Sequence, residues 1–312
     1  MTLSFQADGV ENPANLARIE GAARLLGGVC SSEVLGELIA VENARGARSI
    51  YGRKPLRGDA TLALGNEKRG LSHRVLSEAA ETVAIPTESR TVTTLNVAAA
   101  AAVAGWYVLH GSGPQARGGQ TEKGRPVLLA IGDDHVEVGS TLRSAAAFGF
   151  QDVLLDDRGA GWFDGPSGAR REAMAAARRH KNPIRVYEGA LDVAARFEQV
   201  VFLLPSGHEG SAQRERLAHG RRQLIVIGGG AADLAAMDPE RTRVASLGLE
   251  PVERPPLRLV ASILLAEISR QVGRRLPPPR REVRVPPAYD MALLLEPGGR
   301  SIAVDQSELL AY

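Results

Sequence analysis

Three blocks of sequence recur in the same order in the two halves of the chain, and this repeat limits the folds that the chain can adopt. ENPANLARIEGAARLLGG at 11–28 aligns without gaps with DDHVEVGSTLRSAAAFGF at 133–150. TLALGNEKRG then aligns with QLIVIGGGAA, and TTLNVAAAAAVAG aligns with PLRLVASILLAEI. Chance similarity among alanine-rich helices can explain one block but not three in order. The repeat predicts two copies of one domain.

Short apolar runs alternate with longer helical patterns in both halves. In the first half, Leu38–Val41 and Thr61–Leu64 are typical of strands, and Asn15–Leu26 and Leu95–Leu109 are typical of helices. The second half has expected strands at 127–131, 153–155, 199–204 and 224–227 and an expected helix at 138–148. Such alternation predicts a mainly parallel sheet covered on both faces. We expect each half to be an α/β domain.

Changes in composition mark the domain boundaries. The glycine-rich stretch HGSGPQARGGQTEKG has no apolar periodicity and predicts a flexible connection. We predict a first domain at 1–110, a linker at 111–124, a second domain at 125–273 and a tail rich in proline and arginine at 274–312. A linker of about 14 residues reaches roughly 20 Å, which is enough to join adjacent domains.

The overall composition is that of a folded cytoplasmic protein. Of the 312 residues, 44% are hydrophobic, which allows a core in each half. Cys30 is the only cysteine, so an intramolecular disulfide and a cysteine-rich zinc site are excluded. The first residues lack a secretory signal, and no segment reaches the roughly 18 apolar residues of a membrane span. We expect a soluble protein in a reducing compartment.

The charge of the chain permits RNA binding without requiring it. The net charge is +2 and the pI is about 8.8. Arginine pairs occur at 170–171, 221–222, 274–275 and 280–281. The planar guanidinium suits phosphate, although a solvated arginine-rich surface explains these pairs equally well.

Two motifs of the first half carry a specific resemblance. LALGNEKRGL at 62–71 is followed by IPTESRTVTTLNVAAAAAVA at 85–104. A G-N-E-x-x-G-L after a strand, then I-P, then T-L-N-V-A opening an alanine-rich helix, resembles the second and third signature blocks of the SpoU, or TrmH-like, branch of the SPOUT methyltransferases. The resemblance covers nearly all of 1–110 and, weakly, 126–273.

The resemblance implies a site for S-adenosylmethionine (AdoMet) in the first half. Leu64, Gly65, Ile85 and Leu95 would hold it, inside a trefoil knot formed by the parallel sheet. Gly65 ends a strand, and without a Cβ it would let a ligand approach the backbone at the carboxyl edge of the sheet. The alternative is that Gly65 is only a strand-ending turn and that Ile85 and Leu95 are core residues.

The same motifs would direct three polar side chains at the reacting centre. By resemblance, Glu67, Thr94 and Asn96 hold the cofactor loop and orient a ribose 2′-hydroxyl. For Thr94 and Asn96 a helix cap is the alternative, and for Glu67 it is a surface ion pair.

The first signature block departs from the family pattern N-x-G-x-x-x-R. The first copy keeps Asn15 but has Gly21 at the arginine position, whereas the second copy has Glu137 at the asparagine position and keeps Arg143. In the family this arginine reaches across a dimer interface. The resemblance therefore implies that Arg143 completes the site of the first half in an intramolecular pseudodimer that can exist as a monomer.

Arg18 and Arg24 flank Gly21 by one helical turn on each side and could replace Arg143. Because guanidinium stays protonated in proteins, we expect it to clamp phosphate, with a possible role in proton relay.

The donor site of the second half has lost its motif. Gly228-Gly229-Gly230 stand where the first half has Gly65-Asn66-Glu67, and Arg258 stands in place of Asn96. We expect a degenerate second domain that supplies Arg143 and, with Arg258 and the tail, a surface for RNA.

The group Asp133, Asp134, His135 and Glu137 contains metal-ligand types. Adjacent carboxylates in a strand-to-helix loop seldom converge on one ion, so we predict helix capping or RNA contact and no metal. The sequence thus predicts an AdoMet-dependent 2′-O-ribose methyltransferase that acts on tRNA or rRNA. The alternatives are a catalytically silent RNA-binding or regulatory protein, and methylation of a base or a protein.

Overall fold

The computed structural model describes residues 1–88, 95–113, 125–163, 184–207, 211–218 and 220–273. Thr94, the predicted linker from 114 onward and the predicted tail at 274–312 lie outside these residues. The predicted knot depends on the path of 89–94, which are also outside them, and it stays a prediction.

The first half forms a parallel six-stranded sheet. Its helices are α1 (Pro13–Leu25), α2 (His73–Glu78) and α3 (Val97–His110), with a short 3-10 helix η1 (Ile50–Gly52). Its strands, in spatial order, are β2 (Val29–Cys30), β1 (Leu3–Asp8), β5 (Ala60–Gly65), β3 (Glu37–Val41), β6 (Glu81–Ala84) and β4 (Arg48–Ser49). The strand β5 is apolar and buried along most of its length, as expected for a parallel strand covered on both faces.

The second half also forms a parallel six-stranded sheet. Its helices are α4 (His135–Ala147), α6 (Ala231–Ala235) and α7 (Leu257–Val272), with 3-10 helices η2 (Leu191–Arg196) and η3 (Gly220–Arg222). Its strands, in spatial order, are β9 (Arg185–Glu188), β8 (Asp152–Asp156), β7 (Val127–Ile131), β11 (Gln223–Ile227), β10 (Gln199–Leu204) and β12 (Thr242–Ser246). The α/β fold class with parallel sheets is confirmed.

The two sheets share an order of five strands. The order β2-β1-β5-β3-β6 in the first corresponds to β8-β7-β11-β10-β12 in the second, and β4 and β9 are added at opposite ends. The helices α1 and α4 have 13 residues each, capped by Asn12 and Asp134. Each is followed by a glycine with positive φ, 64° at Gly27 and 79° at Gly149. The first aligned block therefore has the same local structure in both halves.

The structure keeps the register of the second block and shifts that of the third by one residue. The helices α3 and α7 end at glycines with positive φ, Gly111 and Gly273, and counting back equally from them aligns Asn96 with Arg258. That agrees with the pairing expected for Arg258 and moves the third block by one residue. In the sheets, Phe5 pairs with Leu62 and Val127 pairs with Leu224. Because the alignment of α1 with α4 places Val127 on Phe5, Gly228 and Gly229 correspond to Asn66 and Glu67. This is the register of the second aligned block, and it corrects by one residue the expected placement of Gly228-Gly229-Gly230 on Gly65-Asn66-Glu67.

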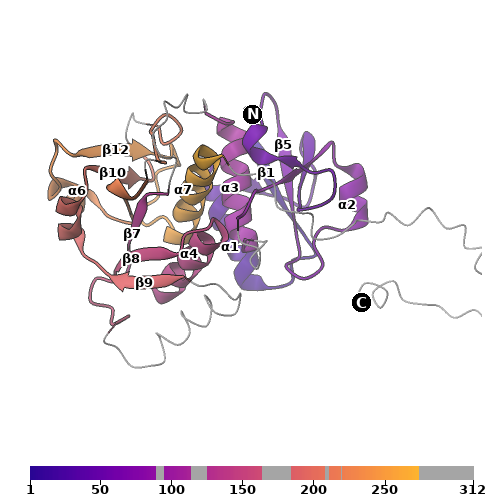
Figure 1. Ribbon diagram of the computed structural model, residues 1–312. Coiled ribbons are helices and arrows are strands. Elements are labelled where there is room, and N and C mark those ends of the chain that lie inside the picture. Colours follow the sequence, from indigo (N-terminus) through magenta and orange to yellow (C-terminus); the bar gives the residue numbers. More distant parts are fainter. Residues whose placement is uncertain (89–94, 114–124, 164–183, 208–210, 219, 274–312) are drawn as a thin grey trace, which may run out of the picture.

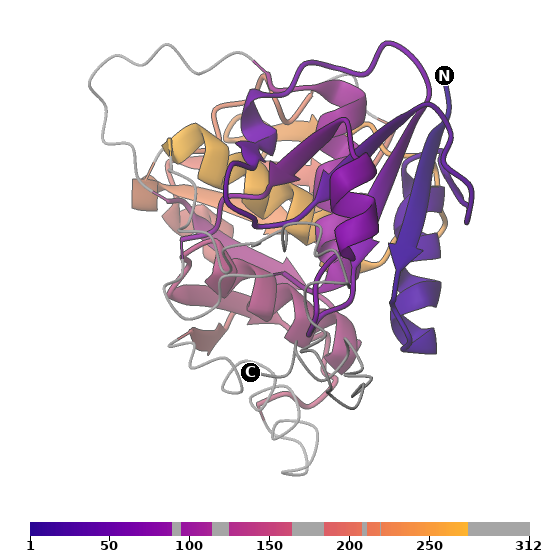
Figure 2. The same cartoon turned by 90° about the vertical axis from the view of Figure 1, so that its right-hand side faces the viewer.

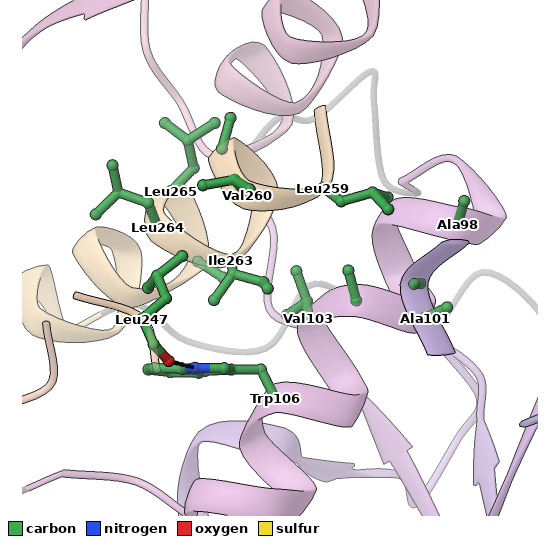
Figure 3. Packing of buried hydrophobic residues seen from close by; sticks show 14 of the residues in the cluster. Ala98, Ala101, Val103, Trp106, Leu247, Leu259, Val260, Ile263, Leu264 and Leu265 are labelled. Carbon is green, nitrogen blue, oxygen red and sulfur yellow. Dashed lines mark hydrogen bonds between the residues drawn. The ribbon is translucent and has the colours of Figure 1, made fainter. Parts of the chain in front are cut away.

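The helices that face inward join the two halves into one core. Figures 1 and 2 show α1, α3, α4 and α7 between the sheets, with α2 and α6 on the outer faces. Side chains of α7, including Ile263, point toward Val103 and Trp106 of α3 in Figure 3, and all belong to one buried cluster. Trp106 Nε1 donates to Leu247 O at 2.8 Å. Burial of each such large apolar side chain contributes about 1.5–3 kcal/mol.

The sequence VAAAAAVAGWYVLH of α3 is apolar on all sides because the helix is covered on all sides. One face packs on α1 and the first sheet and another on α7. Small residues allow close approach, since a Cβ at Gly105 would lie 2.6 Å from Leu26 Cδ1. Despite this composition, no helix in the described ranges is long and apolar enough to cross a membrane.

Two hydrogen bonds between the halves join equivalent pairs of residues. Glu88 N donates to Ala147 O at 2.8 Å, and Glu250 N donates to Leu25 O at 2.9 Å. Ala147 and Leu25 are the last residues of α4 and α1, and Glu88 and Glu250 correspond in the register set by the helix ends. Each half therefore contacts the other with the same loop and the same helix end.

A polar network is buried beside this core. Glu267 is fully buried and accepts hydrogen bonds from Tyr107, Arg270 and Gln271. Arg270 also donates to Gly113 O at 3.2 Å. The first residues of the predicted linker, 111–113, are thus held between the halves.

Candidate functional site

Two of the loops that carry the predicted cofactor residues follow the strands β5 and β6 of the first sheet. The strand β5 ends at Gly65 and β6 ends at Ala84, just before Ile85, with β3 between them. Leu64 is buried, and Ile85 and Leu95 are partly buried against the common core. Because the strands are parallel, Leu64, Gly65 and Ile85 meet at the carboxyl edge of the sheet, which is the usual ligand edge of such folds.

Gly65 is required by the loop itself. Asn66 and Gly70 exchange two backbone hydrogen bonds, of 3.2 and 2.8 Å, and so close a tight turn after β5. A Cβ at Gly65 would lie 2.4 Å from Gly70 C and from Leu71 N. Close approach of the turn's own backbone therefore requires a glycine here, as the alternative of a strand-ending turn implies, and close approach of a ligand stays a prediction.

Replacing Gly65 by alanine should displace this turn. Because the added methyl group meets backbone atoms, we expect a loss of about 1–3 kcal/mol in unfolding free energy, measured by urea titration. Gly58→Ala is the matched control, since no atom lies within 4 Å of a Cβ there. Equal stability of the two variants would contradict the assigned role of the turn.

Two of the predicted catalytic residues touch each other. Asn15 lies in the first turn of α1, is 6% exposed, and its Nδ2 donates to Glu67 Oε1 at the exposed tip of the Gly65 turn. Arg18 NH1 donates to Asn15 Oδ1 at 3.3 Å. Asn15 therefore links Arg18 to Glu67, so Glu67 is fixed by an amide partner from α1.

Asn96 caps α3. Its Oδ1 accepts a hydrogen bond of 3.0 Å from Ala98 N, so the cap reading of this residue is confirmed. The cap uses the oxygen of the carboxamide, and among the described residues the Nδ2 group has no hydrogen-bond partner. Thr94, its predicted companion, is outside the described residues.

Arg143 lies on α4, the helix of the second half that docks on the first. It precedes Ala147 by one turn, and Ala147 O accepts the hydrogen bond from Glu88 of the loop that begins at Ile85. The corresponding position on α1 is Gly21, where a Cβ would lie 4.0 Å from Leu259 Cδ1. Leu259 corresponds to Val97 in the register of the helix ends, so the repeat predicts that the matching side of α4 faces the start of α3.

The other arginines of the first block differ in placement. Arg18 is half-buried and bonded to Asn15, whereas Arg24 is exposed. Arg258 was expected on a surface for RNA, but its side chain is 14% exposed and forms an ion pair with Glu137. Glu137 also accepts from Arg258 N at 3.0 Å.

The acidic residues before α4 have structural roles. Asp134 Oδ1 accepts from Val136 N at 2.7 Å and from Glu137 N at 3.0 Å, so the predicted capping is confirmed. His135 stacks on Trp162 with ring centroids 5.5 Å apart. Within the described ranges, no group of histidine, cysteine and acidic residues could hold a metal ion.

The glycine loop of the second half is closed by its own residues. Gly230 N donates to Asp233 Oδ2 at 2.8 Å, and Arg158 forms an ion pair with Asp233 at 2.6 Å. Burial would raise the pKa of Asp233, but the Gly230 amide and the Arg158 guanidinium together lower it. A Cβ at Gly229 would lie 2.5 Å from the Phe202 ring. This loop carries neither the amide nor the carboxylate of Asn66 and Glu67.

One candidate residue was missed by the sequence analysis. Thr87 is 5% exposed, and its hydroxyl has no hydrogen-bond partner in the part of the chain that the structure describes. A buried hydroxyl without a partner is costly and needs an explanation, and here it follows Ile85 in the candidate cofactor loop. The only sequence signal was its place directly after I-P.

Comparison with known proteins bears on the same segment. Residues 31–106 match the model of the SpoU rRNA Methylase family. No curated protein is significantly similar to the chain.

Similar solved structures include three with low overall agreement. A putative RNA methyltransferase of the TrmH family from Porphyromonas gingivalis is 18% identical, with a TM-score of 0.37, over 64% of this chain and 80% of that chain. The A. aeolicus TrmH/SpoU tRNA modifying enzyme is 13% identical, with a TM-score of 0.36, over 49% and 77%. The SpoU methyltransferase AviRb from Streptomyces viridochromogenes in complex with AdoMet is 18% identical, with a TM-score of 0.35, over 53% and 66%.

The family match begins after α1, which carries the first block that departs from the pattern, and it includes the Gly65 turn and the start of α3. The first half of the chain thus contains a SpoU methylase family domain, of which 31–106 is the matched part.

Proposed function

We propose that this protein is an AdoMet-dependent RNA methyltransferase that modifies ribose 2′-hydroxyls of tRNA or rRNA, with one active site shared between its halves. The observation that carries the proposal is the docking of α4 on the loop after Ile85, through Glu88 and Ala147, because Arg143 lies one turn before Ala147 on the same helix. The contact between Asn15 and Glu67 at the same sheet edge supports it.

The candidate loops fit a bound AdoMet. Ile85 and Leu95 offer partly exposed apolar surface, and the buried Thr87 hydroxyl lacks a partner that a polar ligand group could supply. Leu64, Gly65, Ile85 and Leu95 would hold the cofactor, mostly through backbone groups and apolar contact. When bound, AdoMet supplies an electrophilic methyl group.

The side chains of this protein would position the acceptor. Glu67, fixed by Asn15, holds the Gly65 turn, and the Asn96 carboxamide can donate to the ribose oxygen, with Thr94 as its predicted neighbour. Arg143 would clamp the adjacent phosphate and stay charged, so a proton that it takes from the hydroxyl would be passed on in the same step, from another of its N–H groups, to water or a phosphate oxygen. Positioning of the hydroxyl carries much of the rate enhancement in such a transfer.

We further propose that the chain is a tandem pseudodimer with a degenerate second copy. The shared strand order and the paired contacts of Glu88 and Glu250 support a duplication. The losses are complementary, because Gly21 replaces the arginine that Arg143 retains, and Gly229 replaces Glu67. The proposed domains are 1–110 and 125–273, with the linker and tail as predicted.

Methyl transfer from labelled AdoMet to total tRNA and to rRNA tests the proposed methyltransferase activity. We expect label in one pool, in nucleosides that resist alkaline cleavage of the adjacent phosphodiester because their 2′-hydroxyl is blocked. Label in bases or protein would overturn the ribose assignment. AdoMet binding by calorimetry without incorporation into any RNA would favour the silent RNA-binding protein, which the glycine at position 21 also favours.

A further inference from the structure

Two arginines from different halves face the same seam between α1 and α7. A Cβ at Gly21 would lie 4.0 Å from Leu259 Cδ1, so this side of α1 packs along the start of α7. Arg18 lies one turn before Gly21 on the same side of α1, and Arg258 directly precedes Leu259. The seam therefore brings together a guanidinium of the first half and one of the second.

Positive charge exceeds negative charge at this seam. Arg258 uses its backbone N and its NH2 group on Glu137, the only carboxylate that the described residues place in contact with it. Its Nε and NH1 atoms are buried and have no hydrogen-bond partner in the part of the chain that the structure describes. The hydrogen bond of Arg18 goes to Asn15 Oδ1, which is neutral. Two guanidinium groups thus share one carboxylate.

This arrangement is unfavourable for Arg18 in the protein alone. Burial, and next the positive charge of Arg258, lower the pKa of Arg18, and Glu137 offsets them only in part. Like charges held together away from bulk water are more typical of binding sites than of structural ion pairs. An anion at the seam would relieve the repulsion.

We propose that Arg18 binds a phosphate of the RNA backbone at this seam, beside the proposed methyl-transfer site. The placement follows from Asn15, which contacts both Arg18 and Glu67. A guanidinium can bind phosphate through two parallel hydrogen bonds, and Arg18 remains partly exposed and able to do so. Arg258 and Glu137 form the opposite wall. The inference rests on the proposed function only in naming RNA as the anion.

The test compares Arg18→Gln with Arg24→Gln, which removes an exposed arginine from the same helix. Binding of total tRNA and of rRNA fragments to the full chain is measured at several salt concentrations. Loss of one phosphate contact should reduce the slope of log K against log salt by about 1 for Arg18→Gln. Arg24→Gln should keep the slope. Arg18→Lys should keep the slope with weaker affinity, because lysine retains the charge but not the paired donors.

Kinetic measurements distinguish the phosphate site at Arg18 from the proposed methyl-transfer activity. In the RNA pool that is methylated, Arg18→Gln should raise KM with little change in kcat. An unchanged slope in correctly folded Arg18→Gln, or an equal change in Arg24→Gln, would overturn the site even if methyl transfer occurs. A slope that depends on Arg18 without any methyl transfer would support the site and refute the enzyme proposal.

Discussion

Arg143→Ala is expected to lower kcat for methyl transfer by about 100- to 1000-fold, the usual cost of removing one donor that stabilises a transition state. AdoMet affinity should stay unchanged, because the predicted cofactor contacts come from the loops of the first half. The expectation follows from the docking of α4, since Glu88 N bonds to Ala147 O one turn beyond Arg143. Single-turnover transfer of labelled methyl groups to the responsive RNA pool measures the rate, and calorimetry measures cofactor binding.

Two further variants make the result specific. Arg243→Ala removes an arginine from β12 whose side chain is 71% exposed, and it should retain normal activity. Arg143→Lys should recover part of the rate, because a lysine can neutralise a phosphate without the paired geometry of a guanidinium. Full activity of Arg143→Ala would refute the shared site, and Arg18 and Arg24 would then be the arginines to test.

The sequence was enough to predict the local structure of the repeat but not the alignment of all three of its blocks. Helices α1 and α4 could be aligned because each is followed by a glycine, Gly27 or Gly149, that adopts positive φ. The third block has no marker at its start, where Asn96 and Arg258 differ, so a one-residue error passed unnoticed. Strand β1 was missed because polar residues interrupt the apolar residues of LSFQAD. It pairs with β5 and is covered by α1 and α3, and such tertiary contacts are not visible in a local pattern.

The candidate site could be predicted only as a set of motifs. The contact between Asn15 and Glu67 joins residues far apart in the sequence, and the cap at Asn96 could not be separated from a catalytic role by spacing alone. The ion pair that leaves Arg258 mostly buried was not foreseen, because its partner Glu137 lies on another helix. In each case the missing information was a tertiary contact of a polar side chain.

The polar network at Glu267 could have been suspected, because LRLVASILLAEISRQV places two charged residues in the apolar part of a helix. Charged residues are almost never fully buried unless they are paired. Glu267 accepts hydrogen bonds of 2.7 Å from Tyr107 Oη, 2.8 Å from Arg270 Nε and 2.9 Å from Gln271 Nε2. Burial, and next the charge of Glu267, raise the pKa of Tyr107 well above its ordinary value, so the phenol remains a donor.

Glu267→Leu is therefore expected to lower the unfolding free energy by about 3–5 kcal/mol, since it leaves the Arg270 guanidinium buried without its carboxylate. Urea titration of the full chain measures the loss. Tyr107→Phe removes one hydrogen bond and should cost about 1 kcal/mol. The double variant Glu267→Leu with Arg270→Leu should be more stable than Glu267→Leu alone, because no unpaired charge remains.

The exposed pair of Arg74 and Glu78 on α2 provides the control for charge removal at a surface. Glu78→Leu should change stability by no more than about 0.5 kcal/mol, because solvent screens this pair. If Glu267→Leu cost no more than Glu78→Leu, the network would not hold the halves together. Because Tyr107 belongs to α3 and Glu267 to α7, a large loss confined to Glu267→Leu would mean that the docking that carries Arg143 to the first half depends on this buried carboxylate.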